Sequence, residues 1–257
     1  MKIASWNVNG LRARLDFIKI WLASRQPDVV GLQELKVTEE DFPFDEFSAL
    51  GYHVEIHAQK GWNGVGILSR EPIDVETRGL PGEDDFGARL ITGHTGGLSF
   101  TTIYVPNGKD VGHDDFPLKI DWLGSLADHW KASRSVDDAA VLCGDFNIVP
   151  EALDSWRGED GDGRIFHTTE ERERFAAIRS LGLLDLYREK HPAEQTFSWW
   201  DYRGGAFHRG HGLRIDFLLG TKPILDRTGE VWIDRDFRKK QDGLTASDHA
   251  PVIAELD

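Results

Sequence analysis

A carboxylate and an amide follow a short apolar run near the middle of the chain. The run extends from Ala139 to Cys143, which is the length of a buried strand, and Gly144 ends it. Asp145 and Asn147 come next at alternate positions, so an extended backbone directs both side chains to the same side. Oxygen ligands of this kind bind a hard metal ion or orient a water molecule. A strand that ends in an Asx-turn produces the same pattern, so the motif needs matching polar residues at other strand ends.

Polar residues also end two apolar runs near the start of the chain. Lys2–Trp6 and Val29–Leu32 have the composition of short strands, and Arg12–Ala23 between them has helical spacing. A strand, a helix and a second strand in this order predict two parallel strands, whose carboxyl ends meet at one edge of a sheet. Asn7 and Glu34 follow these strands. Each alone is also typical of a turn or a helix start, and together they suit half of a metal site.

A carboxylate inside a later apolar strand predicts a further pair of interacting groups. Asp216 lies among the apolar residues of Arg214–Leu219, and a buried carboxylate without a partner is costly. Asp248 and His249 precede the last strand, where they suit either a capping turn or contacts to a metal and a phosphate oxygen. In the second case Asp216 orients His249. Tyr104 ends another predicted strand, and its hydroxyl either packs or reaches a ligand.

Composition limits the class of protein. The 257 residues are 40% hydrophobic, enough for a sizeable core, and no stretch approaches the roughly twenty apolar residues of a membrane span. The single cysteine, Cys143, lies in an apolar run and predicts a core thiol. Because the chain starts in a strand-like run without a signal peptide, we expect a cytoplasmic protein with no membrane association. The net charge of −14 argues against a nonspecific nucleic-acid coat, but allows an enzyme that meets phosphates through a metal and a local basic patch.

One segment differs from the acidic remainder of the chain. Thr196–Arg214 combines aromatic side chains, four glycines and several cations. A flexible, positive and aromatic segment suits contact with a nucleic-acid strand. The alternative is a hairpin in which Trp199 and Trp200 pack into the core, and the two descriptions are compatible. The cations predicted to make the contact are Arg203, Arg209 and Arg214, with Arg238, Lys239 and Lys240 shortly before Asp248.

The remaining elements predict one domain over residues 1–257. The spacing of apolar residues predicts helices over Asp115–Trp130 and from Thr169, where a capping-box sequence begins, to about Leu181. No linker, repeat or low-complexity segment divides the chain. Short strands punctuated by glycine and proline predict an antiparallel meander before the first of these helices. The strands are Val54–Ile56, Val65–Leu68, Ile73–Thr77, Arg89–Gly93 and Ser99–Val105.

The motifs together resemble the exonuclease III family of DNA-repair nucleases, which shares a superfamily with deoxyribonuclease I and the inositol-polyphosphate phosphatases. The match runs in order along the whole chain, so motifs that are individually short become specific as a set. They are SWNVNGLRA from Ser5, LQELK from Leu32, GWNGVGILS from Gly61, YVPNG from Tyr104, GDFN from Gly144, WWDYR from Trp199, GLRID from Gly212 and SDHAPV from Ser247.

This resemblance implies a two-sheet α/β sandwich with helices on its outer faces, as in deoxyribonuclease I, and phosphodiester hydrolysis that depends on Mg²⁺ or Mn²⁺. Glu34 resembles the family's principal metal ligand, and Asp145 resembles the residue that activates the attacking water. Asn147 would stabilise the transition state, and Tyr104 would lie beside the phosphate. His249, paired with Asp216, would contact the scissile phosphate. The metal set implied in this way is Asn7, Glu34, Asp145, Asn147, Asp248 and His249.

The activity that the resemblance implies is that of an apurinic/apyrimidinic endonuclease with 3′–5′ exonuclease and 3′-phosphatase activity. We expect a monomer that acts on double-stranded DNA with abasic sites or blocked 3′ ends. Two other classes remain open, namely a superfamily phosphoesterase acting on a small or lipid phosphate ester, and a catalytically silent DNA-binding protein. Gly87 and the loop His208–His211 depart from the family pattern and leave the substrate preference open. The predicted DNA contacts are Arg203, Phe207, Arg209 and Arg214. Trp200, Tyr202 and Phe207 are predicted to wedge or stack where an abasic site leaves a gap, with a core position of Trp200 and Tyr202 as the alternative.

Overall fold

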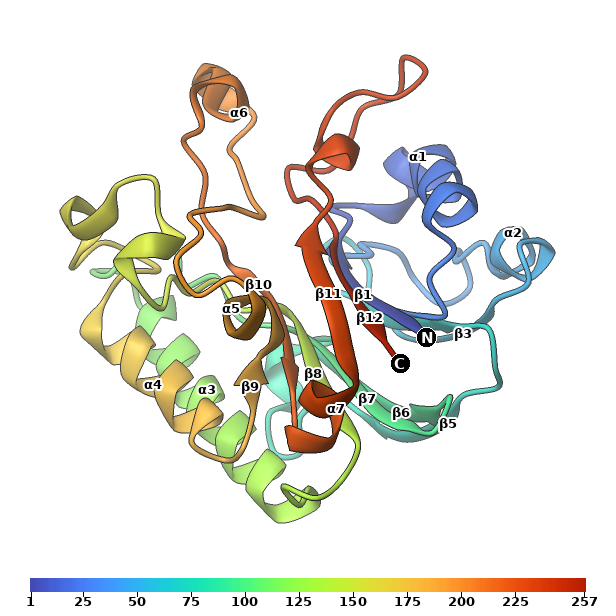
Figure 1. Ribbon diagram of the computed structural model, residues 1–257, viewed down its shortest axis with the longest axis horizontal. Helices are drawn as coiled ribbons and strands as arrows, with labels where there is room; N and C mark the ends of the chain where they lie inside the picture. Colours follow the sequence, from blue (N-terminus) through green and yellow to red (C-terminus); the bar gives the residue numbers. More distant parts are fainter.

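The chain folds into two six-stranded sheets that pack face to face, in a computed structural model that describes residues 1–257 (Figure 1). The first sheet has the strand order β11-β12-β1-β2-β4-β3, and the second has the order β5-β6-β7-β8-β10-β9. The strands of the first sheet are β1 (Lys2–Asn7), β2 (Val29–Gln33), β3 (His53–His57), β4 (Val65–Ser69), β11 (Thr228–Ile233) and β12 (Val252–Leu256). Those of the second are β5 (Asp74–Arg78), β6 (Leu90–Thr95), β7 (Leu98–Tyr104), β8 (Ala140–Asp145), β9 (Leu184–Asp185) and β10 (Asp216–Gly220).

Helices cover the outer faces of both sheets. In Figure 1, α1 and α2 lie outside the first sheet, and α3 and α4 lie outside the second. None of the helices combines the length and apolar character that a membrane span requires. The predicted two-sheet α/β sandwich is therefore confirmed. The helices are α1 (Leu11–Arg25), α2 (Phe44–Ala49), α3 (Asp115–Ser133), α4 (Thr169–Arg179), α5 (Leu186–Lys190), α6 (Ala206–Arg209) and α7 (Lys222–Arg227).

Alternation along the strands produces the layers. In β1, Ile3 belongs to the apolar cluster between the sheets, whereas Ala4 and Trp6 pack with the buried face of α1. In β8, Cys143 lies between the sheets and is completely buried, so the predicted core thiol is confirmed. Leu142, one residue earlier, packs with α3 and α4 on the other face. Side chains of one strand thus fill two different layers, as the period of two requires.

Strand pairing agrees with the main sequence predictions and corrects one of them. β1 and β2 are parallel, as the strand–helix–strand pattern predicts. The five strands predicted between Val54 and Val105 all form and pair antiparallel with one another where they are neighbours. They do not form one meander, because the chain crosses after β4 from the first sheet to the second. The apolar faces of both sheets look alike in sequence, so periodicity predicts the strands but not the sheet to which each belongs.

Short elements and one helix start differ from the sequence predictions. The capping box of α4 uses Thr168 and Glu171, one residue before the predicted Thr169, because the Thr168 hydroxyl accepts the Glu171 N–H. The sequence patterns give no prediction for α2, α5, α6, α7, β9 and β11, all of which span six residues or fewer. Such elements are held by tertiary contacts and carry little periodicity of their own.

A close contact between the two sheets at Gly31 generates a testable prediction. A Cβ atom on Gly31 of β2 would lie 2.7 Å from both Cys143 Sγ and Thr102 Oγ1 of the second sheet. We expect Gly31→Ala to lower the free energy of unfolding by about 1–3 kcal/mol, because it overpacks the interface between the sheets. The control is Gly229→Ala in β11, where the nearest atom to a new Cβ lies at 3.7 Å. Urea unfolding curves of the two variants measure the difference, and equal stabilities would contradict it.

Candidate active site

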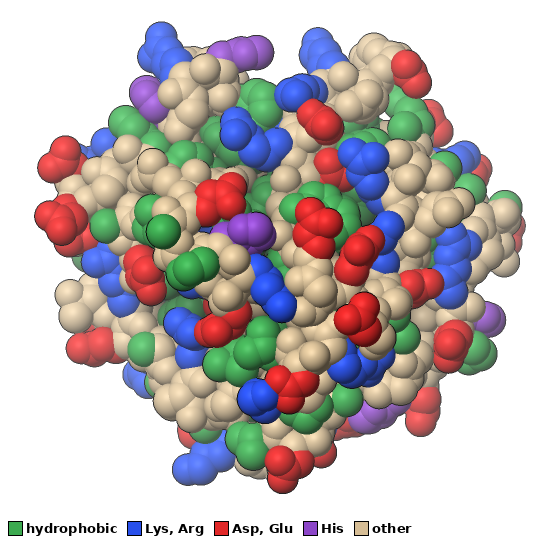
Figure 2. All heavy atoms as spheres, viewed as in Figure 1, with side chains coloured by type: hydrophobic (Ala, Val, Ile, Leu, Met, Phe, Trp, Pro, Cys, Tyr) green, Lys and Arg blue, Asp and Glu red, His purple; other side chains and the backbone are tan.

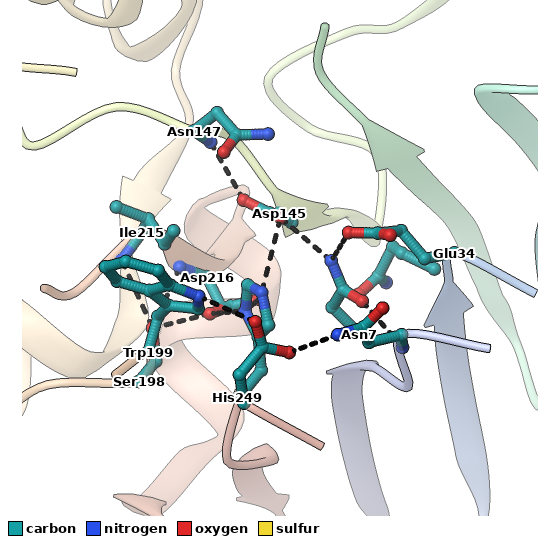
Figure 3. Close-up of polar contacts among 12 residues, drawn as sticks. Asn7, Glu34, Asp145, Asn147, Ser198, Trp199, Ile215, Asp216 and His249 are labelled. Carbon is teal, nitrogen blue, oxygen red and sulfur yellow. Dashed lines mark hydrogen bonds and ion pairs between the residues drawn. The ribbon is translucent and has the colours of Figure 1, made fainter. Parts of the chain in front are cut away.

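Strand ends from both sheets meet at one edge of the sandwich (Figure 3). Asn7 ends β1, and Glu34 directly follows its parallel neighbour β2. In the second sheet, Tyr104 and Asp145 end the parallel strands β7 and β8 as register partners. Parallel strands finish at the same edge, so each sheet supplies two polar side chains to the site.

Two antiparallel strands begin where these four end. Asp216 starts β10 directly opposite Asp145 in the register. His249 precedes β12, which runs antiparallel to β1. The reversed direction brings the amino ends of β10 and β12 to the edge where β1 and β8 finish. The topology therefore explains why residues far apart in the sequence share one site.

The side-chain amide of Asn7 links the carboxylates of the two sheets. Asn7 Nδ2 donates to Glu34 Oε1 at 2.8 Å and to Asp145 Oδ2 at 2.9 Å. Glu34 Oε2 lies 2.6 Å from Lys36 Nζ, so this carboxylate also has a cationic neighbour. The Ser247 hydroxyl donates to the Asn7 carbonyl at 2.7 Å and fixes the end of β1. Two carboxylates that would otherwise repel each other are held together by one neutral donor.

Asp145 is buried and has fixed partners on both oxygens. The Asn147 N–H donates to Asp145 Oδ1 at 2.9 Å, and Asn7 occupies the other oxygen. Burial raises the pKa of Asp145, His249 opposes the rise, and the carboxylates of Asp216 and Glu34 add to it. A carboxylate with a raised pKa in a fixed orientation has the properties of a general base.

His249 is held by a chain of hydrogen bonds from β10. Its Nδ1 lies 2.9 Å from Asp216 Oδ2, and the Ser198 hydroxyl donates to the same oxygen at 2.6 Å. Its Nε2 is directed toward Asp145, 3.8 Å from Oδ2. Burial disfavours a charged imidazole, but the carboxylates of Asp216, Asp145 and Asp248 outweigh burial and raise the pKa of His249. The predicted pairing of Asp216 with His249 is therefore present in the structure.

Three predicted metal ligands come together. One ligand atom from each of Glu34, Asp145 and His249 lies within 4.8 Å of the others. Asn7 adjoins them through its amide nitrogen. Asp248 lies outside this group of three, and its oxygens accept from Asn9 Nδ2 at 2.8 Å and Trp199 Nε1 at 3.0 Å.

The two remaining predicted catalytic side chains flank this cluster. The Asn147 amide donates to the Val105 carbonyl at 3.0 Å and accepts from Asn107 at 3.3 Å. Tyr104 is largely enclosed, and burial together with the charges of Glu34 and Asp145 raises the pKa of its hydroxyl well above the usual value. Arg89 lies over the Tyr104 ring at 4.9 Å and fixes its position.

The prediction that Arg214 contacts DNA is wrong. Its side chain is only 2% exposed, and its guanidinium group pairs with Asp154 and Asp185 at 2.7 Å each. Arg214, two residues before β10, therefore forms a buried ion-pair network within the protein. Arg203 and Arg209 are exposed, as a contact role requires.

Aromatic side chains of the same segment divide between core and surface. Trp200 is completely buried, which agrees with the alternative that it belongs to the core. Phe207 is half-buried, and its ring meets the Trp200 ring edge-on at 4.9 Å. Arg238 is also less free than expected, because it donates to the carbonyls of Trp200 at 3.0 Å and Asp248 at 3.1 Å. The departure at Gly87 has a backbone reason, since its φ of 73° with a ψ of −155° is a conformation that favours glycine.

Sequence reasoning missed three residues beside the site. Lys36 pairs with Glu34, and the LQELK motif is the only sequence feature that could have indicated its place beside the site. Trp62 is 74% exposed between two glycines of positive φ, Gly61 and Gly64, a spacing that could have indicated a presented side chain. Lys119 lies in an amphipathic helix pattern that gives no sign of its burial.

The match to known proteins agrees with this geometry. Residues 4–249 match the Endonuclease/Exonuclease/phosphatase family, and the chain belongs to this family. Over its full length it is 36% identical to exodeoxyribonuclease III of Haemophilus influenzae, all of which is covered. An AP endonuclease from Archaeoglobus fulgidus superimposes with a TM-score of 0.95 at 34% identity, covering 100% of this chain and 99% of that one.

A Neisseria protein extends the comparison to bound DNA. The 3′ phosphatase NExo bound to a product DNA hairpin matches with a TM-score of 0.95 at 36% identity, covering 100% of this chain and 99% of that one. The resemblance to the exonuclease III family predicted from the motifs is thereby confirmed.

The hydrogen-bond chain to His249 predicts a graded series of variants. We expect His249→Ala to reduce turnover by about 10²-fold or more and Asp216→Asn by less, because the imidazole remains but loses its anionic partner. Ser198→Ala, which removes only the outer donor, should reduce turnover a few-fold. Ser180→Ala on the exposed end of α4 is the control. Steady-state rates and DNA-binding constants measure the series, and loss of binding with unchanged turnover would contradict it.

Proposed function

We propose that the chain is a metal-dependent DNA-repair nuclease that hydrolyses phosphodiester bonds in double-stranded DNA at abasic sites and at blocked 3′ ends. The observation that carries the proposal is the meeting of Glu34, Asp145 and the Asp216–His249 pair at one edge of the sandwich. A single domain acting as a monomer contains all of these groups. The family relationship supports hydrolysis of phosphate esters, and features around the site favour a polymer as substrate.

The residues present fit a hard divalent metal. Glu34 and Asp145 supply carboxylate oxygens from two sheets within reach of one ion, which is the chemistry that Mg²⁺ prefers over softer ligands. Burial raises the pKa of Asp145, so a cation would be favoured there. These two carboxylates would hold Mg²⁺ or Mn²⁺, with Asn7 adjoining. Such an ion neutralises negative charge that develops on the phosphate.

The chain's own groups supply the proton transfer and the remaining charge stabilisation. Asp145 accepts the proton that the attacking water loses as its oxygen bonds to phosphorus. The P–O bond to the leaving nucleotide oxygen then breaks, and that oxygen takes up a proton, so that a phosphate monoester and a free hydroxyl result. His249 is held by Asp216 through Nδ1, so its Nε2–H is free to donate to a phosphate oxygen. Asn147 adjoins Asp145 through its backbone N–H, and Tyr104 lies within the influence of the Glu34 and Asp145 charges. Preorganised donors of this kind stabilise a phosphorane because they need no reorganisation during the reaction.

Two cavities flank the reacting groups and favour a strand over a small ester. One, of about 600 Å³, is lined by Trp199, Leu213 and Phe166 and extends to Trp156 and Arg157. The other, also of about 600 Å³, is lined by residues that include Tyr104, Arg89, Lys109 and the exposed Trp62. Trp199 and Tyr104 also border the active site, so a chain of nucleotides could continue on both sides of the reacting phosphate. A small phosphate ester would leave both cavities empty.

Projecting segments beside the site suit contact with a phosphate backbone. The segment that carries α6 and the segment between β11 and β12 rise above the same edge of the sandwich (Figure 1). Figure 2 shows Lys, Arg and His side chains on them, with a hollow between. Local cations of this kind hold DNA although the net charge is −14. The apolar wall of Trp199, Leu213 and Phe166 beside Asp248 suits a deoxyribose that has lost its base.

Metal removal tests the chemical part of the proposal. We expect a chelator to abolish hydrolysis of an abasic duplex, and Glu34→Ala to raise the Mg²⁺ concentration needed for half-maximal rate by at least about tenfold, because a carboxylate ligand is lost. Glu230→Ala on the exposed face of β11 is the control and should keep the native metal requirement. Full activity of Glu34→Ala at the native metal concentration would remove Glu34 from the metal site.

Variants of the α6 segment test the substrate. We expect Phe207→Ala and Arg209→Ala to reduce cleavage of an abasic duplex by about tenfold, with little change on a small phosphodiester, because stacking and phosphate contacts exist only with DNA. Lys222→Ala in α7, far from the site, is the matched control.

The same assay distinguishes the two rival functions. Preferred turnover of inositol phosphates over abasic DNA would indicate a small-ester phosphoesterase. Binding of DNA without any hydrolysis in Mg²⁺ would indicate a silent binding protein. Equal loss on DNA and on the small phosphodiester would mean that the α6 segment supports the fold and does not read damage.

A further inference from the structure

A completely buried ion pair lies behind the active site and takes no part in the chemistry described so far. Lys119 of α3 and Glu171 of α4 are both 0% exposed, and Lys119 Nζ lies 2.5 Å from Glu171 Oε1. Taking two charges out of water costs several kcal/mol per ion, and a well-packed apolar pair of similar volume is often as stable or more stable. Stability alone therefore does not account for this pair.

Lys119 hydrogen-bonds to the backbone at Asn147. Its Nζ donates to the Asn147 carbonyl at 2.6 Å and reaches the Asn107 carbonyl at 3.4 Å. Asn147 has a φ of 50°, in the left-handed region where asparagine is enriched among the residues other than glycine. Such a conformation persists when the surroundings determine it. The same turn directs the Asn147 N–H to Asp145 Oδ1, so the lysine fixes the geometry next to the general base.

Glu171 holds the wall of the cavity beside Trp199. Its Oε1 accepts from the Phe166 N–H at 3.1 Å, and its Oε2 accepts from the Thr168 N–H and hydroxyl at 3.0 Å each. Phe166 has a φ of 72°, which is rare for a bulky residue, and its ring lies 4.9 Å from Lys119 Nζ. The Val149 N–H donates to the Phe166 carbonyl at 2.7 Å and joins the two clamped segments.

We propose that Lys119 and Glu171 are positioning residues that hold Asn147 and the Phe166 wall in register with each other. The inference rests on the proposed function, because it assigns Asn147 to the reacting phosphate and Phe166 to the substrate cavity. The charges suit this task better than an apolar pair. A lysine ammonium has three donors and a carboxylate has two acceptor oxygens, which together satisfy carbonyls and N–H groups from two separate loops.

A neutral double variant tests the proposal. Lys119→Met/Glu171→Gln removes both charges, keeps the volumes similar and leaves one acceptor oxygen, enough for the N–H of either Phe166 or Thr168. We expect the melting temperature to stay within a few degrees of the native value while kcat on abasic duplex falls about tenfold. KM, and DNA affinity measured with chelator present, should change less than about threefold. The exposed pair Lys19–Glu46, changed to Lys19→Met/Glu46→Gln, is the matched control.

A mutant cycle shows whether the lysine acts through Asn147. In an Asn147→Ala background the double substitution should cost little further turnover, because the group that it positions is already absent. A stable double variant with native kcat would overturn the proposal, and so would full additivity with Asn147→Ala. A raised KM with native kcat would assign the pair to binding instead.

A second variant keeps the test decisive if the double variant does not fold. Glu171→Gln alone retains Lys119 and its donation to Asn147, and we expect a loss of kcat of several-fold at unchanged KM. Native kcat in this variant, or failure of both variants to fold, would make the pair a folding element and overturn the proposal. The native protein is assayed in parallel, since its failure to cleave DNA would refute the proposed function, independently of the pair.

Discussion

The Asn7 amide, which donates to a carboxylate from each sheet, is the interaction on which the site depends. Glu34 and Asp145 accept from the same nitrogen at 2.8 and 2.9 Å, although they belong to elements that are remote in the sequence. Without this donor the two carboxylates would lose the one group that hydrogen-bonds to both of them, and their mutual repulsion would be less well offset. The position of the amide is fixed by β1, which lies inside its sheet between β2 and β12. The packing of the two sheets therefore fixes the positions of the three side chains that make this contact.

The strands that carry reacting groups were predictable from the sequence, because each is a short apolar run with a polar residue at its end. Asn7, Glu34 and Asp145 follow that rule, and parallel pairing of β1 and β2 follows from the helix between them. Asp216 was predicted inside a strand and lies at the first residue of β10. The meeting of the two sheets was not predictable from periodicity, which describes each strand alone. The resemblance to a known family supplied that step.

The residues that were predicted wrongly, or not at all, share one property. The groups that surround each of them belong to segments far away in the sequence. Arg214 lies in a segment rich in cations, yet Asp154 and Asp185 enclose it. Lys119 lies in a helix whose sequence pattern does not indicate that this side chain is buried, and its partner Glu171 lies on α4. Sequence reasoning places a charged residue on the surface unless another feature argues against it, because most charged residues are exposed. Only the tertiary structure shows which charges are enclosed.

Division of the active site between the sheets has a consequence for how activity is lost. Asn7 and Glu34 move with one sheet, and Asp145 and Asp216 move with the other. A relative slip of the sheets by a fraction of an ångström would separate the groups before any strand unpaired, because catalytic geometry tolerates little displacement. The rate of the enzyme therefore depends on how accurately the two sheets are aligned with each other. Inactivation on heating would accompany loosening of the interface at Gly31 more closely than the fraying of any single helix.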